Sequence, residues 1–383
     1  MIIKLPTVQT LISELIALPS ISCADPTLDQ SNRAVIEKLA TWCHDLGFHT
    51  EILTIPHYPN KFNLLATLGQ GEGGLILAGH TDTVSYDLSQ WQTDPFQCTL
   101  RDNRLYGLGT TDMKSFFALA LHAASQFKPT ELRQPLMLLA TADEESNMSG
   151  ARALTQKEIG RARHALIGEP TGLRPVRMHK GIFMEAIRVQ GLSGHSSDPR
   201  LGRNALEGMY LVIGELLKWR AELQAKYHNA LFEIPVPTLN LGRIHGGDNP
   251  NRICGDCELQ IDLRPLPGME ISELLQQLQQ RVRSLLVERD LSVEFRPLFE
   301  GLAAMETPPQ AEIVQVAERL THHSAQSVAF GTEAPYFRAL GIDTLILGPG
   351  DIEQAHQSNE FIALDRLSPM IEILTQLIRH FCV

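Results

Sequence analysis

Four short apolar runs, each followed closely by polar or acidic residues, constrain the fold of this 383-residue chain more than any other feature. The runs are continuous rather than alternating, which is typical of strands buried on both faces of a parallel sheet. A helical pattern over 116–127 separates two of them. We therefore predict an α/β fold with a mostly parallel sheet, whose strands include residues 75–78, 136–139, 165–167 and 344–347.

Histidine and acidic residues stand at or shortly after the ends of these strands. Ligands of parallel α/β sheets bind beyond the carboxyl ends of the strands, so we expect these side chains to converge. Zinc and similar divalent ions accept imidazole nitrogen and carboxylate oxygen. Two neighbouring ions can activate water and polarise a carbonyl, which is the chemistry that amide cleavage needs. The candidate metal ligands are His80, Asp112, Glu145, Glu169 and His356, and the set divides evenly between two ions if the aspartate bridges them.

The residues around these candidates strengthen the metal hypothesis, because a lone histidine or acid at a strand end is more often an ordinary loop residue. Asp82 lies two residues after His80, where its carboxylate can orient the imidazole. Glycines shortly before Asp112 give that segment unusual backbone freedom. Adjacent acids at 143–145 would repel one another on a bare surface, whereas a dication reverses that penalty and leaves Glu144 free as a base.

From about residue 182 the pattern changes to short strands and two long helices. Their order, strand-helix-strand-strand-helix-strand, is that of a ferredoxin-like (βαββαβ) unit. This unit interrupts the first one, because the strand at 344–347 and His356 belong chemically with the ligands that precede it. We expect one metal-binding catalytic domain of residues 1–178 and 290–383 and an inserted domain of residues 179–289. The expected elements of the insertion are 183–190, 204–226, 238–245, 258–263, 271–289 and 291–295.

Charge and composition exclude several other classes of protein. The formal net charge of −11, without a local Lys/Arg cluster, argues against nucleic-acid binding. No apolar stretch has membrane-spanning length, and the periodicity over 8–16 indicates an amphipathic helix rather than an export signal. Six scattered cysteines fit a reducing compartment. We expect a cytoplasmic protein that binds neither nucleic acid nor membrane.

Five motifs taken together resemble the M20 metallopeptidase and amidase family. They are HTD at 80–82, GLGTTDMK at 107–114, DEE at 143–145, GEPT at 168–171 and SGHSS at 193–197. The resemblance covers essentially the whole chain and implies a hydrolase with two divalent metal ions per subunit, zinc or alternatively cobalt. It places one ion at His80 and Glu169, the other at Glu145 and His356, and Asp112 between them.

The same resemblance implies further roles. Asp82 would orient the first imidazole, and Glu144 would be the general base. His195, in the inserted dimerisation or lid domain, would reach across the interface of a homodimer to stabilise an oxyanion. Asn251 and Arg264 would bind the carboxylate of the substrate, although an ion pair within the domain is an equally good reading of the arginine. The peptide bond that follows the bridging aspartate would be cis.

Further segments resemble the deacetylase branch of the family that serves arginine biosynthesis, at 179–181, 252–269, 331–335 and 347–350. This branch hydrolyses N2-acetyl-L-ornithine to L-ornithine and acetate. A succinyl-diaminopimelate desuccinylase, an aminoacylase or a dipeptidase would use the same metal ligands, and a non-catalytic metal-binding protein is the alternative from another class. Asp198 and Glu333 are candidate partners for the ornithine ammonium group.

Overall fold

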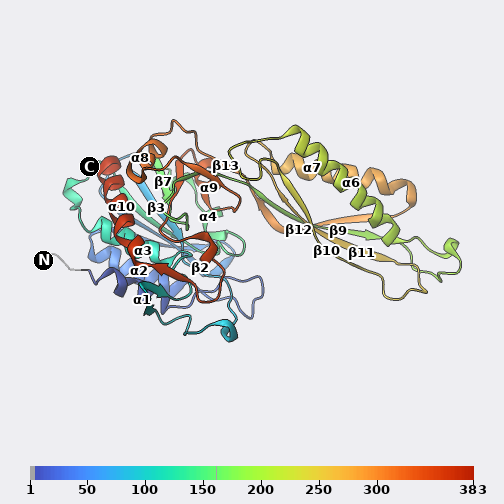
Figure 1. Cartoon of the computed structure of the whole chain (residues 1–383), viewed down its shortest axis with the longest axis horizontal. Helices are drawn as coiled ribbons and strands as arrows, with labels where there is room; N and C mark the ends of the chain where they lie inside the picture. The colour runs from blue at the N-terminus through green and yellow to red at the C-terminus, as the bar shows by residue number, and fades with distance from the viewer. Residues whose placement is uncertain (1–4, 161) are drawn as a thin grey trace. The chain divides into compact units, whose positions relative to one another are not determined.

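The computed structural model describes residues 5–160 and 162–383, which form two compact units (Figure 1). The first unit contains the N-terminal part of the chain to Arg177, residues 307–326 and residues 332–383. The second unit contains residues 178–306 and 327–331. The insertion therefore extends beyond the boundary expected at residue 289. The strand at 292–302 belongs to the second unit, because it pairs with the strand at 182–190.

Four parallel strands form the centre of the main sheet in the first unit. Their spatial order is β6 (Leu136–Thr141), β3 (Leu75–His80), β7 (His164–Ile167) and β15 (Asp343–Ile346). Every residue of the first three is buried, as the continuous apolar runs predict. The prediction of a parallel α/β sheet is confirmed for these four strands.

The outer strands pair in the opposite sense, so the whole sheet is mixed. On one side β2 (Tyr58–Leu68) pairs antiparallel with β6 and with β1 (His49–Ile55). On the other side β8 (Val176–His179) pairs antiparallel with β15 and with β13 (Met305–Glu306), and β14 (Gln326–Val328) also joins β8. A separate small sheet contains β4 (Thr99–Arg101), β5 (Arg104–Tyr106) and β16 (Phe361–Ala363).

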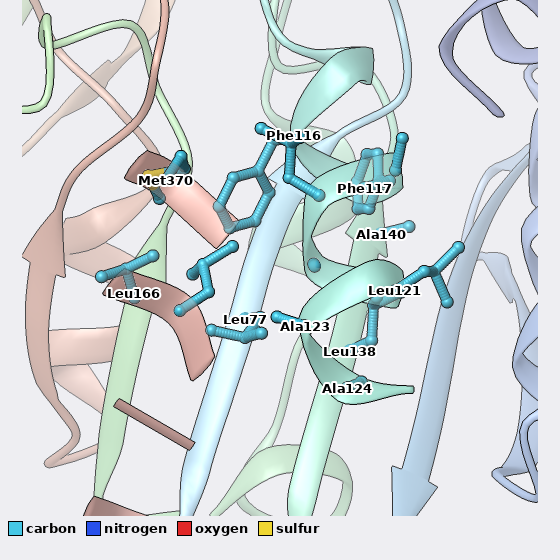
Figure 2. Close-up of a cluster of buried hydrophobic side chains, with 14 of the residues drawn as sticks. Leu77, Phe116, Phe117, Leu121, Ala123, Ala124, Leu138, Ala140, Leu166 and Met370 are labelled. Carbon is cyan, nitrogen blue, oxygen red and sulfur yellow. The ribbon is translucent and has the colours of Figure 1, made fainter. Parts of the chain in front are cut away.

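Helix α3 (Lys114–Ala124) lies at the centre of the apolar core, and every residue in it except His122 is buried. Figure 2 shows Phe116 and Phe117 of this helix in the same apolar cluster as Leu77 of β3 and Leu138 of β6. The helices that share this core with α3 are α1 (Val8–Ile16), α2 (Arg33–Asp45), α8 (Glu312–Thr321) and α10 (Leu367–Cys382).

Both units also contain short helical segments. The short α-helices are α4 (Ser149–Arg152), α5 (Gln156–Ile159) and α9 (Ala334–Ala339). Single 3-10 turns lie at η1 (Leu88–Gln90), η2 (Pro129–Glu131), η3 (Pro199–Leu201), η4 (Val287–Arg289), η5 (Ile352–Gln354) and η6 (Leu364–Arg366). None of the described helices is both long enough and apolar enough to cross a membrane.

The second unit has the predicted ferredoxin-like order of elements. They are β9 (Ile182–Gln190), α6 (Ala205–Lys226), β10 (Thr238–Gly246), β11 (Asp256–Arg264), α7 (Ile271–Leu286) and β12 (Ser292–Leu302). The strands form one antiparallel sheet in the order β10-β11-β9-β12. Buried and half-buried residues alternate along β11, and its buried side chains pack with both helices in a second apolar core.

We predict that Leu77→Ala destabilises the first unit by about 2 to 5 kcal/mol, because the missing side chain leaves a cavity between β3 and α3. Urea denaturation of the whole chain would measure the loss. Leu88→Ala is the matched control, since Leu88 is 62% exposed and its removal should change the free energy of unfolding by less than about 0.5 kcal/mol. Equal effects of the two variants would contradict the assigned core.

Candidate metal centre

The five predicted ligands come from separate segments of the first unit and converge. His80 is the last residue of β3, Glu145 lies four residues after the end of β6, and Glu169 lies two residues after the end of β7. Because β6, β3 and β7 are parallel neighbours, their carboxyl ends share one edge of the sheet. Asp112 comes from the loop before α3, and His356 from the segment after η5.

Two groups of three ligands have their ligand atoms within 4.8 Å of one another, and both groups contain Asp112. The first group also contains His80 and Glu169. The His80 Nε2 atom lies 3.0 Å from Asp112 Oδ1 and 3.8 Å from Glu169 Oε1. One imidazole and one carboxylate thus stand on one side of the shared aspartate.

The second group contains Glu145 and His356. The His356 Nε2 atom lies 2.9 Å from Glu145 Oε2 and 3.5 Å from Asp112 Oδ2. Asp112 therefore directs one carboxylate oxygen toward each histidine. Such a division of its oxygens suits a carboxylate that two divalent ions would share.

The charges of the cluster favour a cation. Burial, together with nearby Asp112, raises the pKa values of Glu145 and Glu169. The hydrogen bond with Glu145 raises the pKa of His356 to about 9, and the hydrogen bond between His80 and Asp112 raises the pKa of His80 despite its burial. Raised pKa values of both the glutamates and the histidines indicate a site of strongly negative potential. A divalent cation would neutralise that potential.

Glu144 stands beside this cluster. It forms a third group with His80 and Glu145, again with ligand atoms within 4.8 Å of one another. Glu144 as a whole residue is partly exposed, whereas the neighbouring Asp143 is buried. Burial of the carboxyl group and nearby Glu169 raise the pKa of Glu144 well above its usual range. The position and basicity suit a group that exchanges protons with water.

The structure places Asp82 differently from the expected carboxylate–imidazole pair. The His80 Nδ1 atom makes its hydrogen bond to the Asp82 backbone carbonyl at 3.0 Å, whereas the Asp82 Oδ1 atom is 3.7 Å away. The Asp82 Oδ2 atom accepts a hydrogen bond from the backbone N–H of Glu145 at 3.0 Å. The residue still orients His80, but through its main chain, and its carboxylate holds the backbone of another predicted ligand.

The loop before α3 has the backbone features predicted for it. The peptide bond between Asp112 and Met113 is cis, as expected. Gly109 has a φ of +88°, a value in the left-handed region that favours glycine, and a Cβ atom there would approach Thr83 to 3.0 Å. The glycine thus allows the loop to turn closely beside its neighbours before Asp112.

A comparison with known proteins agrees with the motifs and the fold. The sequence profile of peptidase family M20/M25/M40 matches residues 76–380. The chain belongs to this family. It is 48% identical to the acetylornithine deacetylase of Pasteurella multocida (strain Pm70) and 49% identical to that of Pectobacterium carotovorum subsp. carotovorum (strain PC1). Each match extends over 379 residues and covers 99% of both proteins.

Solved structures show the same M20 fold at lower identity. The M20 family metallo-carboxypeptidase Sso-CP2 of Sulfolobus solfataricus matches with a TM-score of 0.76 and 19% identity, over 98% of this chain and 99% of that one. A dinuclear metal-binding M20 peptidase of Bacillus subtilis matches with a TM-score of 0.64 and 14% identity, over 97% and 96%. These likenesses concern the fold alone.

The second unit of this M20 chain carries His195 and Asn251 on two loops that lie side by side. The backbone N–H of Ser196 donates to the Asn251 carbonyl at 3.0 Å, and His195 forms a bridge with Arg252. Both His195 and Asn251 are exposed. The His195 Nδ1 atom lies 2.7 Å from the Ser197 hydroxyl oxygen and 3.2 Å from the Ser197 backbone nitrogen.

Arg264, the other predicted substrate ligand of this M20 chain, already has an anionic partner. Its Nε and Nη2 atoms donate to the two carboxylate oxygens of Asp262, at 2.9 and 3.0 Å. Asp198 is similarly engaged, because Arg200 donates to both of its oxygens at 2.8 Å. Glu333 is fully buried in the first unit and accepts a hydrogen bond from Thr141 Oγ1 at 2.8 Å.

Sequence reasoning did not identify a buried cation beneath the acidic run of this M20 chain. Lys61 is 5% exposed, and its Nζ atom lies 2.7 Å from Asp29 Oδ1 and 2.6 Å from Asp143 Oδ1. Asp143, whose φ is +60°, also accepts hydrogen bonds from Ser22 and Ser149. Its side chain is therefore held on several sides, immediately before the two glutamates. The local sequence does not predict the burial of Lys61, because a lysine in a strand ordinarily has its ammonium group in solvent.

We predict that Lys61→Met destabilises the first unit by about 3 to 5 kcal/mol, because it leaves two carboxylates near a buried position without their cation. Thermal and urea denaturation would measure the change. The control Lys38→Met removes an exposed pair with Glu14, and it should cost less than about 1 kcal/mol. A Lys61 variant as stable as the control would contradict this account.

Proposed function

We propose that this chain hydrolyses N2-acetyl-L-ornithine to L-ornithine and acetate with two divalent metal ions, in the cytoplasm. The observation that carries the proposal is the identity of 48% and 49%, over 99% of both proteins, with two acetylornithine deacetylases. The convergence of two histidines and three carboxylates at one sheet edge supports it independently. The six cysteines are free thiols, which fits a reducing compartment.

The donor set fits a pair of zinc ions, with cobalt as an alternative. His80 and Glu169 would hold one ion, Glu145 and His356 the other, and Asp112 both, in keeping with the two groups that share it. The remaining nitrogen of His80 is occupied by a backbone carbonyl, which leaves Nε2 as the ligand atom. When bound, the ions would polarise the amide carbonyl and lower the pKa of water between them.

Glu144 would act as the proton carrier. Its carboxylate would take a proton from the attacking water, whose oxygen forms a bond to the acetyl carbonyl carbon. As the C–N bond breaks, the same proton would pass from Glu144 to the departing nitrogen, so that acetate and the free amine of ornithine leave. The position of its carboxyl group beside His80 and Glu145 suits this exchange, and neighbouring cations would favour its ionised form.

Side chains of the second unit would bind the rest of the substrate. The His195 Nε2 atom would donate to the tetrahedral oxyanion, because Nδ1 is already engaged by Ser197. Asn251 is exposed on the adjacent loop and would donate to the α-carboxylate. Arg264 would bind the same carboxylate by sharing or exchanging its present partner Asp262.

A homodimer is part of the proposal, and two features of the second unit support it. Strand β10 is an edge strand with the exposed side chain Ile244, and unpaired sheet edges readily accept another strand. Helix α6 exposes Leu206, Tyr210 and Leu217 along one side, and Tyr210 is 74% exposed. We expect a second copy to cover this edge and this apolar stripe.

Other hydrolases with the same metal centre differ from the proposed deacetylase in their substrates. A desuccinylase, an aminoacylase or a dipeptidase could use the same two groups of ligands, so the metal centre alone does not select among them. The full-length identity to two acetylornithine deacetylases favours the acetylated substrate. A non-catalytic metal-binding protein is disfavoured, because Glu144 and all five ligands are present together.

We predict that Glu144→Gln lowers kcat by about 10²- to 10⁴-fold, because the amide cannot carry the proton. Metal content, measured by mass spectrometry of the purified protein, should stay at the wild-type value. Glu145→Gln is the matched comparison on the next residue, and it should lose metal as well as activity. A Glu144 variant with most of its turnover would show that another group is the base.

We predict that kcat/KM for N2-acetyl-L-ornithine exceeds that for N-succinyl-diaminopimelate by more than about tenfold, or about 1.4 kcal/mol. The succinyl group carries an additional carboxylate that must be desolvated and paired, whereas the acetyl group is small and neutral. Steady-state kinetics with both compounds would measure the ratio. Asn251→Ala should weaken both reactions alike, since the α-carboxylate is common to them. Faster hydrolysis of the succinyl compound would overturn the substrate assignment.

We predict that His195 acts on the active site of the partner subunit. A His195→Ala chain mixed with a Glu144→Gln chain should recover activity, because each heterodimer then contains one site with both residues. Complete exchange should restore roughly a quarter of wild-type activity. Verified heterodimers without recovery would place the action of His195 within its own chain.

The dimer itself is tested by Tyr210→Glu, which places a charge in the exposed stripe of α6 and should yield monomers in analytical ultracentrifugation. Leu88→Glu changes another exposed apolar side chain, in the first unit, and is the control that should leave the association state unchanged. Monomers of both variants, or of neither, would count against the proposed interface.

A further inference from the structure

The acid Glu360 has no place in the chemistry described so far, yet it lies among the predicted ligands. It follows His356 by four residues and directly precedes β16. Its side chain is 1% exposed. A buried carboxylate is costly unless its oxygens accept hydrogen bonds, so its partners indicate what it does.

Backbone N–H groups of the loop that carries Asp112 surround the Glu360 carboxylate. The Oε2 atom accepts from Gly109 at 2.9 Å, and the Oε1 atom accepts from Thr111 at 2.6 Å and from Asp112 itself at 3.0 Å. The backbone carbonyl of Glu360 accepts from Gly107 at 3.0 Å. One residue therefore satisfies four donors within a loop of six residues.

The arrangement is that of an anchor rather than of a ligand. All three side-chain partners are N–H donors, so Glu360 acts only as an acceptor and both of its oxygens are engaged. Among the described residues, Glu360 belongs to none of the groups whose possible ligand atoms lie within 4.8 Å of one another. The contacts instead determine where the main chain of Asp112 lies.

The anchor also joins two of the predicted ligands. His356 and Glu360 lie in the same short segment, and the His356 Nε2 atom is 3.5 Å from Asp112 Oδ2. The segment is held from another direction by Asn359, whose side chain accepts from the backbone N–H of Gln92 and donates to the carbonyl of Gln90. The separation of Asp112 from His356 therefore depends on how Glu360 binds the loop.

We infer that Glu360 is a positioning residue of the metal centre, which holds the bridging Asp112 at the correct distance from His356 through three backbone hydrogen bonds. The inference rests on the proposed two-metal function. Partners of metal ligands commonly change metal affinity or activity by about 10- to 100-fold when removed. Glu360 would act in this way on the main chain of a ligand rather than on its side chain.

Cobalt binding to the full chain tests the inference. Glu360→Gln keeps the shape of the side chain but turns an N–H₂ group toward a backbone N–H, so at least one hydrogen bond is lost. Chains freed of metal by chelation would be titrated with Co²⁺ and followed by visible absorption, with stoichiometry measured independently. We expect the affinity for at least one of the two ions to fall by about tenfold or more, with an altered absorption spectrum.

Two further variants separate positioning from general stability. Glu185→Gln makes the same exchange at a carboxyl group that is buried in the second unit, and it should leave cobalt affinity and spectrum unchanged. Glu360→Asp keeps the charge but is one methylene shorter, so it should weaken cobalt binding too, and it replaces the glutamine variant if that does not fold. Wild-type affinity and spectrum in the folded Glu360 variants, with only a lower melting temperature, would overturn the inference.

The wild-type titration distinguishes this inference from the proposed function. A wild-type chain that binds fewer than two cobalt ions would overturn the metal centre and the positioning role together. A chain that binds two ions but does not hydrolyse N2-acetyl-L-ornithine would overturn only the substrate, and the Glu360 variants would still decide the role of the anchor.

Discussion

Mutual repulsion of carboxylates is the constraint on which the first unit depends. Asp112, Glu145 and Glu169 lie within a few ångströms of shared partners, in surroundings where like charges are costly. Each must therefore be held from outside the cluster. The parallel strands supply the convergence, and the two imidazoles supply opposite charge within it. Buried hydrogen bonds and ion pairs beneath the cluster hold the carboxylates in place. A set of ligands that is free to spread apart would not retain two neighbouring ions.

Local sequence patterns predicted the parts of this arrangement that depend on neighbours along the chain. Continuous apolar runs identify strands buried on both faces, and the structure confirms them at β3, β6, β7 and β15. The alternation in β11 and the long periodic helices identify the inserted unit in the same way. Since parallel strands bring their carboxyl ends to one edge, the proximity of the five candidate ligands could also be anticipated before any coordinates.

Partners that are distant in sequence could not be predicted in this way. Lys61 and Asp143 meet across 82 positions of a chain with many lysines and acids, and neither carries a local signal. Asp82 contacts His80 through its backbone carbonyl, which no motif specifies. The residue at which the insertion ends depends on the pairing of β12 with β9, which continues to Leu302 and so beyond the strand expected at 291–295. The antiparallel outer strands depend on tertiary pairing for the same reason.

The division of the chain into two units explains why the family is easier to infer than the substrate. All five candidate ligands and the candidate base lie in the first unit, and one kind of metal centre can serve different substrates on the same fold. The groups proposed for substrate binding lie in the second unit, on exposed loops around His195 and Asn251. Loops tolerate substitution without loss of the fold. Selection for a new substrate can therefore alter the second unit while the candidate metal ligands, and the hydrogen bonds of Glu360 to the loop of Asp112, stay as they are.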